Sequence, residues 1–318
     1  MDCAFHPGTE TLLSCTRCGR PACGACLRPA PVGSHCPACV AGIAPDADLT
    51  VAANRRALSP RRPPAARTRP GWVFYALVGL FLALLAATYV VDADPNSGAV
   101  RVLAMAIVIV GALLSVTLHE WAHAYVAYRG GDRSVVDQGY LTLDFRKYAH
   151  PLLSFGLPIL FLLAGGLPLP GGAVWIDRSA LRSRGWASAM SVAGPLMNLV
   201  NGVVLLGLVS SGLLDGNVVL ASALSFLGYV LLVIVVLNLL PVPGLDGYGA
   251  LEPWLPAALR SALAPVRSWG FLILLLLVFQ TNALGFMYDW SLSLAQAIGV
   301  DPALIGLGSY LASPQLNR

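Results

Sequence analysis

Several apolar runs of close to 20 residues constrain this chain more than any other feature of its sequence. A helix of about 20 apolar residues spans the hydrocarbon core of a bilayer. Charged residues make up 11% of the 318 residues and hydrophobic residues 57%, whereas a soluble domain carries roughly 25% charged residues. The sequence therefore excludes a soluble globular protein and predicts a polytopic α-helical membrane protein.

The apolar runs predict about five membrane-spanning helices and one re-entrant segment. We expect the spans at residues 72–91, 102–125, 186–214, 220–240 and 266–280. The shorter apolar stretch 152–167 is interrupted by glycine and proline, so we expect it to enter and leave the bilayer on one side. Residues 139–145 alternate between polar and apolar, a pattern that predicts a short membrane-associated strand. Residues 284–298 fit either an interfacial helix or a partial span.

Arginines cluster immediately before the first predicted span. Residues 55–69 contain six arginines and no acidic residue, whereas Asp92 and Asp94 follow that span. Because basic residues tend to stay on the cytoplasmic side, this asymmetry predicts a cytoplasmic N-terminus. No nucleic acid is expected to bind, because neither a recognition helix nor an aromatic platform accompanies the arginines. The Ala-, Arg- and Pro-rich composition indicates the plasma membrane of a bacterium, its inner membrane.

All seven cysteines lie within the first 39 residues and form regularly spaced pairs. Two residues separate the members of each pair: Cys3 and His6, Cys15 and Cys18, Cys23 and Cys26, and Cys36 and Cys39. Side chains at this spacing can bind one tetrahedral ion, so the eight ligands predict two structural zinc sites. The odd cysteine count and the pair spacing disfavour a disulfide framework. Zinc also supplies folding free energy that about 40 residues cannot obtain from an apolar core.

This pattern resembles the B-box type of zinc finger, in which the ligand pairs interleave. The resemblance implies one zinc on Cys3, His6, Cys23 and Cys26 and a second zinc on Cys15, Cys18, Cys36 and Cys39. His35 and Cys36 are alternatives for the same ligand position. Residues 1–40 are thus expected to form a small cross-braced finger, and residues 41–70, which are rich in alanine, proline and arginine, a flexible linker.

The second predicted span contains an HExxH motif, His119 to His123. Two histidines four residues apart lie on one face of a helix and can bind zinc together. Glu120 lies about 100° around the helix from His119, where it can reach a water molecule at the metal without being a ligand. Ionisable residues inside a span are costly and usually functional, so the motif predicts a catalytic zinc site.

A catalytic zinc needs a third protein ligand and an open position for water. Outside the motif and the finger the one remaining histidine is His150, and the best carboxylate candidate is Asp246. Asp246 follows Pro241 and Pro243, which interrupt the helix and let the backbone turn a carboxylate inward. If residues 152–167 are re-entrant, Asp246 lies on the same side of the membrane as the two histidines.

The HExxH motif in a span, followed by the sequence NLLPVPGLDG at 238–247, resembles the site-2 proteases, which are intramembrane zinc metalloproteases. The resemblance covers about residues 100–252 and includes Ala193, Gly194, Pro195 and Asn198 in the intervening span. It implies that the catalytic zinc is bound by His119, His123 and Asp246. It also implies that Glu120 is the catalytic base. Asn198 and Asn238 become candidates for binding the substrate backbone or an oxyanion, with an interhelical hydrogen bond as the alternative role.

The sequence therefore predicts a protease domain, residues 71–318, that acts in the lipid bilayer. Its substrates are expected to be single-span or membrane-tethered proteins, cleaved within or near their transmembrane segments. Strand addition by 141–145, with the Pro- and Gly-rich stretch 165–172, is expected to hold the unwound substrate. The finger is expected to bind a protein partner or substrate. The alternative function is a non-proteolytic zinc-binding membrane adaptor, which the presence of Glu120 disfavours.

Overall fold

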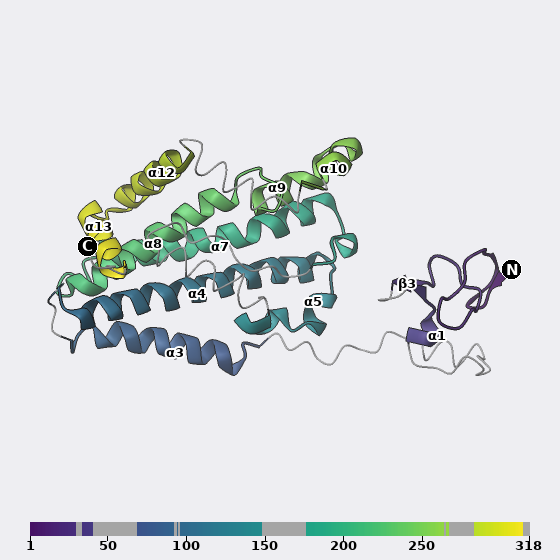
Figure 1. Cartoon of the computed structure of the whole chain (residues 1–318), viewed down its shortest axis with the longest axis horizontal. Coiled ribbons are helices and arrows are strands. Elements are labelled where there is room, and N and C mark those ends of the chain that lie inside the picture. Colours follow the sequence, from purple (N-terminus) through teal and green to yellow (C-terminus); the bar gives the residue numbers. More distant parts are fainter. Residues whose placement is uncertain are drawn as a thin grey trace. The chain divides into compact units, whose positions relative to one another are not determined.

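The computed structural model describes most of the chain. The described residues are 1–29, 34–40, 69–147 without 92, 93 and 95, 176–266 without 264, and 283–313. The chain divides into two compact units, Met1–Ala66 and Arg67–Arg318, which Figure 1 draws with their elements labelled. Four predicted features lie wholly or nearly wholly outside the described residues: the re-entrant segment 152–167, the linker, the span 266–280, and His150.

Short strands and one helical turn surround the cysteines of the N-terminal unit. Strands β1 (Asp2–Cys3) and β2 (His6–Glu10) pair in antiparallel fashion, as do β3 (Arg28–Pro29) and β4 (Ser34–His35), and α1 spans Pro37–Val40. No disulfide joins any of the seven cysteines. Besides cysteines, the buried apolar residues among those described in this unit are Phe5, Ala22 and Ala38. Such a core is too small to stabilise a fold without further cross-links.

The second unit is helical. Its larger helices are α3 (Trp72–Ala87), α4 (Gly98–Gly130), α7 (Arg184–Ser210), α8 (Val218–Asn238), α12 (Ala283–Ile298) and α13 (Pro302–Ala312). Shorter helices are α5 (Ser134–Asp137), α9 (Asp246–Leu251) and α10 (Ala257–Leu263), with 3₁₀ turns η4 (Arg178–Ala180) and η5 (Glu252–Trp254). Among the described residues, α4, α7 and α8 are long and apolar enough to cross a membrane, and α3 and α13 are shorter apolar helices.

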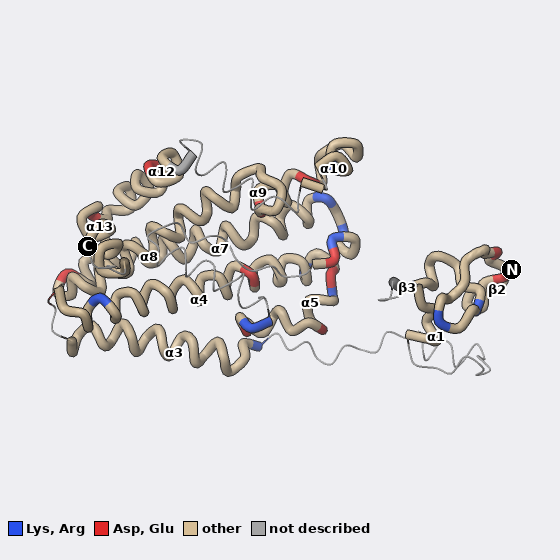
Figure 2. Tube along the Cα trace, in the orientation of Figure 1, with Lys and Arg blue, Asp and Glu red and all other residues tan. Residues whose placement is uncertain are grey.

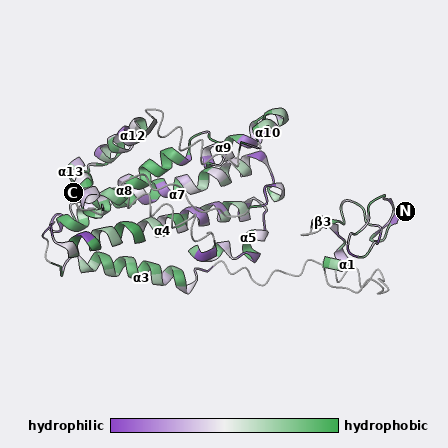
Figure 3. Ribbon diagram, in the orientation of Figure 1, coloured by the Kyte–Doolittle hydropathy of each residue, from purple (hydrophilic) through white to green (hydrophobic). Residues whose placement is uncertain are grey.

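Helix α8 is the centre of this unit. Most of its residues are buried, and it contacts α4, α7, α12 and α13 (Figure 1). Gly202 of α7 and Gly228 of α8 allow the two backbones to approach closely, since a Cβ on Gly228 would lie 2.8 Å from the Leu206 side chain. Apolar residues follow the lengths of α3, α4 and α8 (Figure 3), and charged residues gather near helix ends and in the connections (Figure 2). This distribution is typical of helices that lie in a bilayer.

The predicted spans agree with the observed helices where both are described. The predicted spans 102–125, 186–214 and 220–240 correspond to α4, α7 and α8. The predicted span 72–91 corresponds to α3, which ends four residues earlier, at Ala87, where the hydroxyl of Thr88 donates to the Leu85 carbonyl. The stretch 284–298 forms a helix, α12.

Helix α4 is longer than a bilayer is thick. Its 33 residues extend about 50 Å at 1.5 Å per residue, whereas the hydrocarbon core measures about 30 Å. His119 lies about 30 Å along this helix from its first residue. Trp121, two residues after His119, stacks on Tyr125 with ring centroids 5.0 Å apart. Arg129 donates to the Tyr125 hydroxyl. Stacked aromatics followed by arginine are typical of the membrane–water interface, and the HExxH motif shares this part of α4.

The prediction of a strand at 139–145 is wrong. Two 3₁₀ turns, η1 (Tyr140–Thr142) and η2 (Phe145–Lys147), occupy this stretch. Gly139 and Leu143 adopt left-handed backbone conformations, with φ of +73° and +53°, and these interrupt an extended chain. Residues 140–144 are all buried, so the alternating pattern does not separate a buried face from an exposed one.

Local hydrogen bonds hold these turns. The Thr142 hydroxyl donates to the Gly139 carbonyl, and the Asp144 carboxylate accepts from the backbone and guanidinium of Arg146. The backbone N–H of Gly71, just before α3, donates to the Thr142 carbonyl. Side chains that bond their own neighbouring backbone compete with strand pairing. Strand addition by residues 141–145 therefore has no strand to support it.

Candidate metal centres

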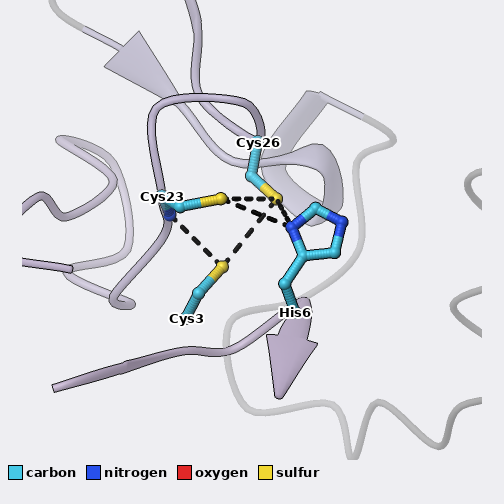
Figure 4. Close-up of side chains that lie close together, drawn as sticks. All are labelled: Cys3, His6, Cys23 and Cys26. Carbon is cyan, nitrogen blue, oxygen red and sulfur yellow. Dashed lines mark hydrogen bonds between the residues drawn. The ribbon is translucent and has the colours of Figure 1, made fainter. Parts of the chain in front are cut away.

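The finger ligands gather into two groups of four. Cys3, His6, Cys23 and Cys26 form the first tetrad, shown in Figure 4, and Cys15, Cys18, Cys36 and Cys39 form the second. This is the interleaved grouping that the B-box resemblance implies. Cys36, rather than His35, belongs to the second tetrad.

The spacing of the ligand atoms fits a shared zinc ion. The Sγ atoms of Cys3 and Cys26 are 3.8 Å apart, and those of Cys23 and Cys26 3.7 Å. His6 Nδ1 lies 3.3 Å from both the Cys23 and the Cys26 sulfur. Zn–S bonds of about 2.3 Å in a tetrahedron place neighbouring sulfurs about 3.8 Å apart. With four protein ligands each, both tetrads are closed sites suited to a structural role.

Backbone N–H groups prepare one thiol in each tetrad for metal binding. Cys23 N–H donates to Cys3 Sγ, and Cys36 N–H donates to Cys15 Sγ, both at 3.2 Å. Burial raises the pKa of Cys3 and Cys15, but these and neighbouring backbone N–H groups outweigh burial and lower each pKa to about 6. The thiolate form that binds zinc is therefore favoured at these two positions.

A third group of ligands lies in the helical unit. It consists of His119 and His123 of α4 and Asp246, the first residue of α9. The two Nε2 atoms are 3.1 Å apart, and they lie 3.3 Å and 3.4 Å from the Asp246 oxygens Oδ2 and Oδ1. Zinc bonds of about 2.0–2.1 Å in a tetrahedron place neighbouring ligands about 3.3 Å apart. Three donors at this spacing fit zinc and, among the described residues, leave the fourth position open, as a catalytic site requires.

Helix α7 passes directly beside this site, and a glycine faces the ligand atoms. A Cβ at Gly194 would lie 2.3 Å from His123 Nε2 and 2.6 Å from His119 Nε2. Any other residue at this position would therefore occupy the space that a metal ion needs. Met190, four residues earlier, accepts a 2.6 Å hydrogen bond from His123 Nδ1 through its carbonyl. This bond places the ring proton on Nδ1 and leaves Nε2 available to the metal.

The third ligand is fixed by contacts that α9 and the following turn η5 make with α7 and the turn η4. The Ser188 hydroxyl of α7 donates to the Ala250 carbonyl at 2.6 Å and accepts from the Trp254 indole at 2.8 Å. Arg178 forms an ion pair with Glu252 at 2.8 Å. Ala250, Glu252 and Trp254 lie within eight positions after Asp246, so their contacts hold the short helix that presents its carboxylate.

Close backbone packing also determines where α9 begins. A Cβ at Gly247 would lie 2.2 Å from the Leu239 carbonyl oxygen. The glycine after Asp246 thus lets the chain fold back on the end of α8. After the turn that contains Pro241 and Pro243, Asp246 lies beside the two histidines.

The other predicted site residues are buried near these elements. Glu120 is 5% exposed and follows His119 on α4. Asn198 of α7 places its side-chain amide 3.1 Å from His119 Nδ1. Asn238 is the last residue of α8 and is also buried. Met190 and Ser188 could not be predicted from the sequence, because one acts through its backbone and the other belongs to no motif.

Comparison with known proteins identifies relatives. The chain is 40% identical over 250 residues to a Mycolicibacterium smegmatis protein provisionally named zinc metalloprotease Rip2, covering 79% of this chain and 96% of that protein. It is 42% identical over 209 residues to Rip2 of Mycobacterium tuberculosis, covering 64% of this chain and 79% of the relative. It is 34% identical over 184 residues to the Bacillus subtilis protein provisionally named zinc metalloprotease YwhC, covering 54% and 80%. No family model and no solved structure matches the chain.

These relatives are covered over most of their lengths, and their names agree with the ligand geometry in the helical unit. An HExxH pair, a distant aspartate at tetrahedral spacing and long apolar helices are all present. The chain belongs to the site-2 protease family of membrane zinc metalloproteases.

Proposed function

We propose that this protein is an intramembrane zinc metalloprotease that hydrolyses peptide bonds within or near the transmembrane segments of membrane proteins. The observation that carries the proposal is the three-ligand cluster of His119, His123 and Asp246, with one position open, in a unit of long apolar helices. A soluble peptide would not need a site on such helices, whereas a membrane-embedded substrate reaches it through the bilayer.

Each residue of the site has a distinct role in this proposal. His119, His123 and Asp246 bind the zinc ion. When bound, zinc acts as a Lewis acid that polarises the scissile carbonyl and lowers the pKa of water. The Glu120 carboxylate accepts the proton of the attacking water and then donates it to the nitrogen of the leaving amine. Glu120 suits this role because it is buried and lies about 100° around the helix from His119, beside the ligands rather than among them.

The substrate must present an extended backbone, because a helical segment hides its carbonyls in hydrogen bonds. Single-span or membrane-tethered proteins fit best, since the site lies near one membrane face. Asn238, at the end of α8 and eight residues before Asp246, is our candidate for contacting the substrate backbone or an oxyanion. An amide there can both donate to a carbonyl oxygen and accept from a backbone N–H.

We further propose that the chain has three parts: a B-box-like zinc finger at 1–40, a linker at 41–70, and the protease domain at 71–318 with its catalytic core at about 100–252. Two closed tetrads support a structural rather than catalytic role for the finger, which would bind a protein partner or substrate. The M. smegmatis relative is covered almost completely while about a fifth of this chain remains outside the match. That share is about the size of the Met1–Ala66 unit.

Placement in a bacterial plasma membrane, with the N-terminus in the cytoplasm, completes the proposal. The relatives come from bacteria. The arginines at 55–69 precede the first apolar helix, as the positive-inside rule requires of a cytoplasmic segment. A cytoplasmic location of the finger also keeps its seven cysteine thiols reduced and able to bind zinc.

Cleavage of single-span reporter proteins by detergent-purified full-length protein tests the proposal. Wild type and Glu120→Gln are compared, with and without a chelator, and zinc is measured on the same samples. The expected result is loss of cleavage in Glu120→Gln, by at least about a hundredfold for a lost general base, with the core zinc retained. Intact cleavage by Glu120→Gln would contradict the role of Glu120. No cleavage by wild type, with zinc present only in the finger, would favour the membrane adaptor.

A further inference from the structure

The two metal-binding histidines each turn their second ring nitrogen, Nδ1, toward helix α7. His123 Nδ1 donates to the Met190 carbonyl at 2.6 Å. His119 Nδ1 faces the side-chain amide of Asn198, 3.1 Å from its Nδ2 atom. Asn198 is 2% exposed, so this amide has little access to water. The Nδ1 side of the His119 ring is thus covered by one polar side chain, that of Asn198.

The protons at this contact decide what Asn198 does. His119 Nε2 points to the cluster with His123 and Asp246 and must be unprotonated to bind metal, so the ring proton is on Nδ1. An N–H at Nδ1 and an NH₂ at Asn198 are both donors and cannot bond each other. The Asn198 Oδ1 atom, meanwhile, is buried and has no hydrogen-bond partner among the residues that the structure describes. A half-turn of the amide exchanges its oxygen and nitrogen. The oxygen then accepts the Nδ1–H of His119, so the two donors no longer face each other and Oδ1 has a partner.

We propose that Asn198 is a positioning residue whose Oδ1 accepts the Nδ1–H of His119 and thereby fixes the ring orientation and tautomer of that zinc ligand. The inference deepens the proposed protease function and rests on the zinc site within it. It replaces the substrate-binding role that the family resemblance implies for Asn198, because the amide is already engaged with the metal ligand.

The spacing along α7 supports this assignment. Met190, Gly194 and Asn198 are four residues apart, so they lie on one face of the helix. Met190 orients His123, Gly194 leaves room for the ion, and Asn198 orients His119. One helical face therefore supplies the acceptor for each histidine and the space between them. Pro195, on the same turn, lacks the N–H that would otherwise occupy the Ser191 carbonyl.

An acceptor on Nδ1–H makes the opposite nitrogen a stronger ligand. Removing such a partner typically lowers metal affinity about 10–100-fold. An aspartate at position 198 would still offer an oxygen acceptor, whereas a leucine of similar size would not. The two substitutions therefore separate loss of the acceptor from loss of shape.

Asn201 provides a matched control on the same helix. Its Nδ2 donates to the Ser115 hydroxyl of α4 at 3.3 Å, and neither residue belongs to the metal cluster. Asn201→Leu thus removes an interhelical hydrogen bond between the same two helices without touching a ligand. An effect of Asn198→Leu that arose only from weaker α4–α7 packing would appear in this control as well.

Cobalt titration of the detergent-purified full-length protein tests the inference. Cobalt bound to thiolates absorbs strongly in the near ultraviolet, which measures the finger alone, whereas all sites contribute to the visible d–d bands. The occupancy of the His and Asp site is therefore the visible signal that remains after the contribution of the finger, fixed by its near-ultraviolet band, is subtracted. We expect the core affinity to fall about 10–100-fold in Asn198→Leu, to stay within a few-fold in Asn198→Asp, and to be unchanged in Asn201→Leu. The d–d spectrum should also change in Asn198→Leu, because the His119 ring is no longer fixed.

The outcomes distinguish the inference from the proposed function. Equal core affinity in wild type and Asn198→Leu would overturn the inference while leaving the protease proposal intact. A loss in Asn198→Asp as large as in Asn198→Leu would show that the amide nitrogen matters, and would also overturn it. If Asn198→Leu does not fold, the comparison of Asn198→Asp with wild type still decides. Absence of cobalt from the wild-type core would reject the zinc protease itself.

Discussion

The finger and the helical unit both gather zinc-binding side chains, but they assemble them in opposite ways. In the finger, eight ligands come from the first 39 residues and make up most of what is buried there. In the helical unit, Asp246 lies more than 120 residues beyond the HExxH motif, and packed helices bring the three ligands together. Metal binding creates the first structure, whereas the fold of the second creates a metal site. A closed tetrad accordingly serves stability, and an open three-ligand site serves chemistry.

Removing zinc should produce the largest difference between the two units. Structural zinc contributes about 10–16 kcal/mol in zinc-finger peptides, whereas the α4, α7 and α8 bundle is held by helix packing. After treatment with a strong chelator, hydrogen exchange of the full chain should show lost protection in residues 1–29 and retained protection in α8. Equal loss of protection in α8 would contradict the distinction between the two kinds of site.

Filling the space at Gly194 should empty the core site alone. Gly194→Ala places a methyl group 2.3 Å from His123 Nε2, so zinc should fall from three ions per chain to two and cleavage should be lost. Elemental analysis against protein concentration measures the ratio. Gly207→Ala on the same helix is the control, because a Cβ there meets no atom of the described residues within 4 Å. Three zinc ions in Gly194→Ala would show that α7 does not limit the site.

A more distant contact should have a smaller effect on the core. Ser188→Ala removes the hydroxyl that bonds Ala250 and Trp254, which loosens the helix bearing Asp246. A hydrogen bond contributes about 0.5–1.5 kcal/mol, so core metal affinity should fall roughly two- to tenfold while the finger is unchanged. Cobalt titration measures both. Ser210→Ala, whose hydroxyl bonds Gly207 within α7, should leave the core affinity as in wild type.

The smallest effect is expected at the turns of residues 140–147, where the helical unit, like the finger, is held by contacts between residues close in sequence. The hydrogen bond from the Arg146 side chain lowers the pKa of Asp144 below its usual 3.8. A carboxyl group with a lowered pKa stabilises the fold above its usual pKa, and this contribution is lost as pH falls through the lowered value. Hydrogen-exchange protection of residues 140–147 should therefore decrease on acidification in wild type and respond less in Asp144→Asn. The same response in both would contradict this role, and Asp137→Asn, an exposed carboxylate nearby, is the control.

The sequence was most informative where spacing alone determines geometry. The pairs beginning at Cys3 and Cys15, and the i, i+4 pair of His119 and His123, encode their ligand positions locally. The strand at 139–145 was predicted wrongly because alternation indicates a strand only when one face is exposed, and here residues 140–144 are all buried. The acceptor at Met190 is a backbone carbonyl, which no side-chain pattern reveals. Gly194 belongs to the recognised motif, but the need for glycine there comes from the close approach of α7 to the histidines of α4, which only the structure displays.

The distribution of thiols between the two units separates two kinds of reactivity. All seven cysteines lie within the first 39 residues, and the core cluster consists of imidazole and carboxylate groups alone. Oxidants and electrophiles attack thiolates and release the zinc they hold, but they leave histidine and aspartate ligands largely unchanged. Oxidative stress therefore acts chemically on the finger and spares the hydrolytic centre, so the chain carries a redox-sensitive module joined to a catalytic one that is resistant.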